Sequence, residues 1–169
     1  YRHSSSDSTS GWIEVSPVKV VMRMDTLYLI TFELAEDGTL KYKNYLFENI
    51  IGVSETNTPF AKVEFKARDY YKYAFGKWTS TAPHEDVSLL VKSDAKWLQT
   101  QFEKSHFNPE IVKRFDKDKN MIVDMKLRIT PDFETWLVGV SEDVRILKPA
   151  KLKESIKAKL QKALAEMDA

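Results

Sequence analysis

Hydrophobic and polar residues alternate in short runs over the first 66 residues, a pattern typical of β-strands. The stretch 27–34, LYLITFEL, is apolar at both alternating sets of positions and predicts a buried central strand. Asp37-Gly38 follows it as a strong hairpin signal, so the next strand should return antiparallel. The expected strands are 12–23 (with Pro17 at an edge or a bulge), 27–34, 40–47, 50–53 and 61–66, with a short helix at 68–75. We expect these strands to form a small, strongly bent antiparallel barrel.

The second half of the chain mixes strand and helix periods. Val87, Leu89 and Val91 alternate as in a strand, whereas Ala95, Leu98 and Phe102 share one helical face. The expected elements are strand 87–91, helix 95–105, strands 111–115 and 121–129, a short helix that begins at Thr130-Pro131-Asp132, strand 144–147 and helix 150–167. The order β-α-β-β-α-β followed by a helix predicts a ferredoxin-like sandwich. The expected fold class is therefore α+β, a barrel followed by this sandwich.

The domain organisation follows from the same change of period. Residues 76–84, GKWTSTAPH, are expected as a linker between a barrel domain at 1–75 and an α+β domain at 85–169. Residues 3–11 are Ser-rich and polar and are expected to form a solvated loop. Because the chain begins with Tyr1 rather than Met, we expect that upstream sequence has been removed and that the first strand is truncated.

Composition excludes several classes of protein. The 169 residues include 43% hydrophobic residues, which is enough for a core, and carry a net charge of only +1. Such a balance argues against a chain that coats nucleic acid by bulk charge. The absence of cysteine excludes disulfides, thiolate zinc sites and iron–sulfur clusters. No apolar run is long enough to span a membrane and no signal peptide is visible, so we expect a cytoplasmic protein without a membrane partner.

Motifs that would carry catalysis or metal binding are incomplete. Asp116, Asp118 and Asn120 match the opening of a calcium loop, but Met121 and Leu127 stand where that loop needs Gly and Glu, so a hairpin turn is favoured. Two Ser-x-x-Lys matches lack their companion motifs. The three histidines are far apart, and the five glycines form no phosphate loop. We expect no catalytic residue, metal or cofactor, and hence no enzyme.

Aromatic and cationic residues gather in the first half. Tyr28, Tyr42 and Tyr45 lie close in sequence to Arg23 and Lys43. Rings that stack on bases beside cations that meet phosphates are typical of proteins that hold nucleotides or single strands. The alternative is that the rings belong to the core and the cations to a solvated strand face. The residues by themselves leave both interpretations open.

Several short motifs, taken together in their order and spacing, resemble those of the WYL-domain proteins of bacteria, which are mostly transcriptional regulators. The matching segments of the first half are Val15-Ser16-Pro17, Leu27-Tyr28-Leu29, Lys43-x-Tyr45-x-x-Glu48-Asn49-Ile50 and Phe75-Gly76-x-Trp78. Those of the second half are Trp136-Leu137-x-Gly139 and Val144-x-Ile146-Leu147-x-Pro149-x-x-Leu152, which resemble the C-terminal extension of the family. Leu27 replaces the name-giving Trp, and Lys43 and Asn49 stand where the family usually has arginines.

The resemblance implies an SH3/Sm-like barrel that senses a ligand, followed by an α+β extension that helps to form a homodimer. It also implies an N-terminal DNA-binding domain, absent here, and a nucleotide or single-stranded nucleic acid as the effector. The ligand-binding residues that it indicates are Tyr1, Arg23, Tyr28, Lys43, Tyr45 and Asn49. Because Lys offers a point charge and Asn none, the loss of two arginines implies a weaker or different phosphate pocket.

Two other classes of function stay open. One is a protein-interaction and oligomerisation module without a small ligand, in which the amphipathic helix 150–167 docks a partner. The other is a hydrolase built on the barrel, which requires a cleft with clustered, perturbed carboxylates or histidines.

Overall fold

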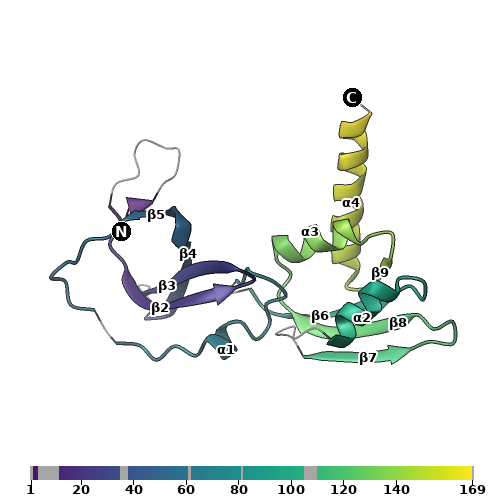
Figure 1. The fold of residues 1–169 in the computed structure, drawn as a ribbon, viewed down its shortest axis with the longest axis horizontal. Helices are drawn as coiled ribbons and strands as arrows, with labels where there is room; N and C mark the ends of the chain where they lie inside the picture. Colours follow the sequence, from purple (N-terminus) through teal and green to yellow (C-terminus); the bar gives the residue numbers. More distant parts are fainter. Residues whose placement is uncertain are drawn as a thin grey trace. The chain divides into compact units, whose positions relative to one another are not determined.

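The computed structural model describes residues 2–3, 12–34, 38–60, 62–80, 82–104 and 110–168. They form a mixed α+β structure with antiparallel sheets, which confirms the expected fold class at this level. The chain divides into two units, Tyr1–Ala67 and Arg68–Ala169 (Figure 1). Each unit is described by itself below.

Unit 1 (Tyr1–Ala67) contains two small antiparallel sheets among its described residues. The first has the strand order β2-β3-β4, and the second pairs β1 with β5. The bounds are β1 Arg2–His3, β2 Ser16–Arg23, β3 Thr26–Leu34, β4 Leu40–Leu46, the 3-10 turn η1 Phe47–Asn49 and β5 Ile50–Gly52. The register of β2 shifts between Pro17 and Lys19, so Pro17 lies at an irregularity of an edge strand, as its missing N–H predicts.

A two-residue turn joins β2 to β3. Arg23 pairs with Thr26, which leaves Met24 and Asp25 between them with φ of 45° and 63°. Positive φ at both central residues belongs to the mirror-image turns that match the twist of a hairpin. Neither residue is the Asn or Gly that signals such a turn in a sequence, so the pattern did not predict this hairpin. The turn fixes the register of the whole β2–β3 pair.

The expected closed barrel is not found among the described residues. The segment 12–15 is outside the ladder of β2, and residues 62–66 form no strand. The alternation at 62–66 persists, because Val63 and Phe65 are half-buried and the flanking lysines are exposed. Phe65 packs on Tyr42 with ring centroids 5.3 Å apart, so a side-chain contact joins this segment to β4.

Unit 2 (Arg68–Ala169) is built on one four-stranded antiparallel sheet with the order β7-β8-β6-β9. The elements follow the predicted order β-α-β-β-α-β and a terminal helix. Their bounds are β6 Glu85–Val91, α2 Lys96–Lys104, β7 Ile111–Phe115, β8 Met121–Leu127, α3 Pro131–Gly139, β9 Val144–Lys148 and α4 Ala150–Met167. A short helix, α1 (Ala67–Tyr70), spans the boundary between the units where a longer one at 68–75 was expected.

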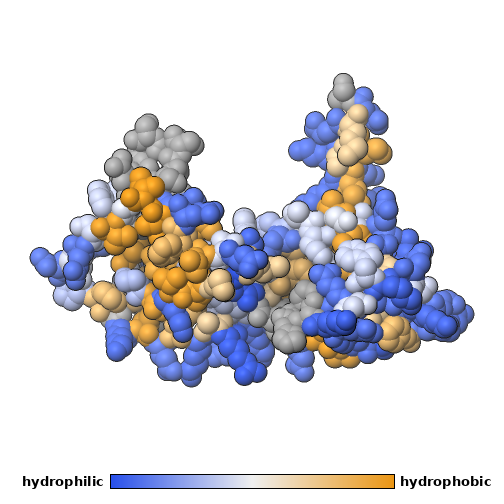
Figure 2. Space-filling model, in the orientation of Figure 1, coloured by the Kyte–Doolittle hydropathy of each residue, from blue (hydrophilic) through white to orange (hydrophobic). Residues whose placement is uncertain are grey.

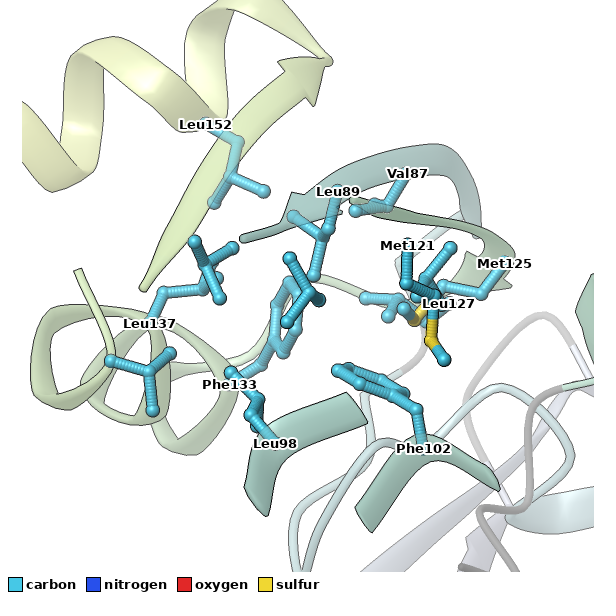
Figure 3. Close-up of a cluster of buried hydrophobic side chains, with 14 of the residues drawn as sticks. Val87, Leu89, Leu98, Phe102, Met121, Met125, Leu127, Phe133, Leu137 and Leu152 are labelled. Atoms are coloured by element: carbon cyan, nitrogen blue, oxygen red, sulfur yellow. The ribbon is translucent and has the colours of Figure 1, made fainter. Parts of the chain in front are cut away.

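One face of this sheet carries the core of unit 2. Val87, Leu89 and Val91 on β6 alternate into it, and each is 2% exposed or less. The three longer helices cover this same face, because Phe102 of α2, Phe133 of α3 and residues of α4 join the same cluster (Figure 3). The opposite face of the sheet is mixed: Arg114, Asp124 and Lys126 share it with the apolar residues Leu90, Val112 and Ile122.

Residues 76–84, expected as a linker, fall within unit 2 and contact its other residues. The backbone N–H of Trp78 donates to Asp132 at 3.2 Å, and His84 stacks on Tyr73 with centroids 4.0 Å apart. Arg128 donates from Nε to the carbonyl of Ala82 at 2.9 Å. The charge of Arg128 therefore serves to hold this segment on the sheet.

Candidate functional site

The residues indicated by the family resemblance lie on three strands and a turn of unit 1. Arg23 ends β2, Tyr28 is in β3, and Lys43 and Tyr45 are in β4. Asn49 ends η1 and is half-buried. The last of the set, Tyr1, lies outside the described residues.

The strand register separates this set into two groups. Tyr45 pairs with Leu29 and Lys43 with Thr31, so both β4 residues share the face of the odd-numbered residues of β3. Tyr28 belongs to the even-numbered face of β3, and Arg23 lies on that same face because Val21 pairs with Tyr28. Lys43 and Tyr45 are therefore together, whereas Arg23 and Tyr28 lie on the other side of the sheet.

Lys43 is already engaged by a carboxylate. Its Nζ donates to Glu33 Oε1 at 2.6 Å, and both side chains are half-exposed. The hydrogen bond that Lys43 donates to Glu33 raises the pKa of Lys43. Desolvation opposes this rise, and the charges of Glu33 and Tyr45 add to it. Lys43 thus stays cationic, and an anion on this face must compete with Glu33.

Exposed apolar side chains surround this face. Val20, Met22 and Leu27, which belong to it by register, are 48%, 70% and 45% exposed. Figure 2 shows hydrophobic residues gathered over the strands of unit 1. The face that carries Lys43 therefore offers an apolar surface next to a cation, an arrangement that suits a ligand with a ring and a negative charge.

A groove of about 1340 Å³ lies in unit 1 between the segment 12–17 and the segment 53–60. Its lining is rich in apolar side chains, and the titratable residues among them are Glu14, Glu33 and Glu55. The Thr56 hydroxyl donates to Glu14 at 3.0 Å. Hydrogen bonds from Thr58 and Thr56 lower the pKa of Glu14.

The sequence did not indicate this groove as a site. Its two walls are about 40 residues apart in the chain, as the Glu14–Thr56 contact shows, and in these two walls only Ser16 and Pro17 belong to a regular strand, β2. Trp12 and Phe60, which line the groove, have apolar neighbours in the sequence in Ile13 and Ala61, so the local pattern did not set them apart from core residues. Both are more than half exposed in the structure.

A second groove, of about 1200 Å³, lies in unit 2 against the sheet face opposite the core. Charges of both signs line it. Arg114 pairs with Asp124 and Lys126 with Asp86 across neighbouring strands. Since the two charges of each pair neutralise each other, the groove presents no concentrated charge of one sign. Such paired charges are typical of a sheet face in contact with solvent.

The described residues contain no group of three or more His, Cys, Asp or Glu side chains arranged to hold a metal ion. The Asp116–Asn120 segment forms the polar turn expected of it. Asp116 accepts hydrogen bonds from the backbone N–H groups of Asp118 and Asn120, both at 2.9 Å. In the part of the chain that the structure covers, no helix has the length and apolarity to cross a bilayer.

Comparisons with known proteins bear mainly on the second half of the chain. Residues 83–164 match the family of the WCX domain. No curated protein sequence matches the chain. Among solved structures, proteasome accessory factor B/C (PafBC) of Arthrobacter aurescens is similar with a TM-score of 0.41 and 18% identity, over 99% of this chain and 25% of that one. The chain thus spans about a quarter of the length of the PafBC chain. Its similarity to a protein family covers residues 83–164, which match the WCX domain.

Proposed function

We propose that this chain is the effector-sensing and dimerising part of a bacterial transcriptional regulator of the WYL type, which acts in the cytoplasm and is not an enzyme. The match of residues 83–164 to the WCX domain carries this proposal, because WCX is the C-terminal extension associated with WYL domains. The motifs of the first half that resemble WYL domains lie directly before it. DNA is read, in this proposal, by an N-terminal domain outside the chain.

The finer fold belongs to the same proposal. Two observations on unit 2 support a ferredoxin-like sandwich. Its elements follow the order β-α-β-β-α-β along the chain, and its antiparallel strands lie in the order β7-β8-β6-β9 in the sheet. An SH3/Sm-like fold for unit 1 is proposed from the sequence resemblance alone, because its described strands form two separate small sheets and no closed barrel.

The effector is an anionic molecule with a ring, such as a nucleotide or a short single-stranded nucleic acid. Lys43 and Tyr45 support this assignment, because they share one face of the β2-β3-β4 sheet and Tyr45 is near enough to influence the pKa of Lys43. A cation beside an aromatic ring is the common arrangement for single strands. Binding would change the balance between two states of a dimer only if the effector prefers one of them.

Fluorescence polarisation with labelled oligothymidine and labelled nucleotides tests the effector. Lys43→Ala is expected to weaken binding about tenfold, the effect of losing one charge-assisted contact. Glu33→Gln is expected to tighten it about threefold, since Lys43 is then released from its 2.6 Å partner. Added salt should weaken binding in both cases.

Lys19→Ala is the matched control. Lys19 pairs with Ile30 and therefore lies on the opposite face of the sheet, so this substitution removes the same charge from the other face. It should leave the affinity unchanged. If no nucleotide or oligonucleotide binds, or if Lys19→Ala and Lys43→Ala have equal effects, the proposed effector site is wrong.

A second candidate function keeps the dimer and has no small ligand. Leu152 and Ile156 of α4 are buried, and the stripe that they begin continues as Leu160, Leu164 and Met167, which are 36%, 61% and 82% exposed. In Figure 1 this end of α4 runs out beyond the other elements of unit 2. An apolar stripe continued past its own core favours contact with a second copy of the chain.

Sedimentation velocity separates this candidate from the first. Leu164→Lys should convert a dimer to a monomer, because it places a charge in the stripe. Ala158→Lys places the same charge on the opposite side of the helix and should not. A dimer that survives Leu164→Lys rules out this contact.

A further inference from the structure

The groove of unit 1 is bounded by large exposed side chains. Trp12 and Phe60 stand on its two walls at 59% and 54% exposure, and Val53 is 78% exposed. Pro17 and Pro59 also line it. Exposed apolar groups clustered around a hollow are typical of surfaces that contact another molecule.

The charge of this groove has one sign. Its lining contains Glu14, Glu33 and Glu55, and no Lys, Arg or His among the described residues. Lys43 compensates Glu33 from outside the lining, which leaves the carboxylates of Glu14 and Glu55 without a cation in the lining. Unit 1 as a whole has seven Lys and Arg against nine Asp and Glu, so its wider field has the same sign. The complementary ligand is cationic.

The walls select the shape of the ligand. The segments 13–15 and 53–60 run outside the strand ladders and contain no helix. Hydrogen bonds between Glu14 and the threonines of the second segment hold the two together. A hollow between two irregular walls, lined by rings and prolines, fits an extended chain, since an extended peptide presents alternate side chains and its backbone groups to both walls.

We propose that this groove binds an extended peptide segment in which lysine or arginine alternates with proline or other apolar residues. The apolar side chains lie against Trp12 and Phe60, and the cations meet Glu14 and Glu55. This site is distinct in chemistry from the proposed effector site, because it requires a ligand of opposite charge.

Fluorescence polarisation with two labelled peptides tests the proposal on the full chain. In the first peptide arginines alternate with prolines and leucines, and in the second glutamates replace the arginines. Only the first should bind. Glu55→Lys should weaken its binding about tenfold and Trp12→Ala by a similar factor, the effect of losing one central contact. Binding should also weaken as salt is added.

Glu64→Lys is the matched control, because Glu64 is exposed, pairs with Lys66 at 3.3 Å and does not line the groove. It makes the same charge change and should alter the affinity by less than about twofold. Phe60→Ala serves as the second ring variant should Trp12→Ala fail to fold by circular dichroism. Lys43→Ala should leave peptide binding intact or improve it, whereas it weakens binding of an anionic effector.

Four results would overturn the proposal. The first is that neither peptide binds, and the second is that both bind equally. The third is that Glu64→Lys and Glu55→Lys have equal effects, since the attraction is then general to unit 1. The fourth is that oligothymidine displaces the peptide while Glu55→Lys leaves the affinity for the peptide unchanged, which would assign the groove to nucleic acid instead.

Discussion

Substitution of Leu152 by Ala tests how α4 is held on unit 2. The Leu152 side chain is 2% exposed and belongs to the core beneath the helices (Figure 3). Burial of a leucine contributes roughly 1.5–3 kcal/mol, and the cavity left by truncation adds to the loss, so Leu→Ala at such a site costs about 3 kcal/mol. In a unit of about 100 residues this lowers Tm by roughly 12 to 24 °C.

Leu164→Ala provides the matched comparison on the same stripe. Leu164 is 61% exposed, so its truncation should cost about 0.5 kcal/mol or less. Far-ultraviolet circular dichroism follows the transition, because α2, α3 and α4 all belong to unit 2 and dominate the helical signal. Equal losses of stability in the two variants, or a loss below about 1 kcal/mol for Leu152→Ala, would refute the view that only the first half of α4 is docked.

Two further variants probe the chemistry of unit 2 and the turn of unit 1. Burial alone would raise the pKa of Glu134, but hydrogen bonds from Lys159 and Ser155 outweigh it and lower the pKa from the ordinary 4.5. The ionised carboxylate therefore stabilises the fold above about pH 4.5, and this stabilisation is lost as the pH falls further. Glu134→Gln should accordingly reduce the loss of unfolding free energy on the acid side of a stability–pH curve. An unchanged curve would contradict this. Asp25→Gly should stabilise the β2–β3 hairpin by about 0.5–1 kcal/mol in urea denaturation, because Gly adopts the φ of 63° without strain; destabilisation would contradict it.

The elements of unit 2 were predictable because their patterns are local. Helix α4 occupies the predicted range 150–167, and its periodic stripe extends over the whole helix. Thr130-Pro131-Asp132 starts α3 as its residue types predict. Each of these signals depends on neighbours within a few turns of chain, which the sequence displays directly.

The faces of the sheet in unit 1 were not predictable for the same kind of reason. Whether Arg23 and Lys43 share a face of the sheet depends on the strand register. That register is set by the Met24-Asp25 turn, which has no Asn-Gly signature. A shift of one residue moves every side chain of a strand to the other face. The groove was not predicted because Trp12 and Phe60 are far apart in the sequence and line one groove only in the tertiary structure.

Tyrosine-ring NMR gives the most direct test of the proposed effector site. Tyr45 and Tyr28 lie on opposite faces of the same sheet, and Tyr→Phe variants assign their ring signals. On titration with oligothymidine, we expect saturable shifts at Tyr45 and none at Tyr28. Shifts at Tyr28 without shifts at Tyr45, or no shift at either ring, would contradict binding on the face that carries Lys43.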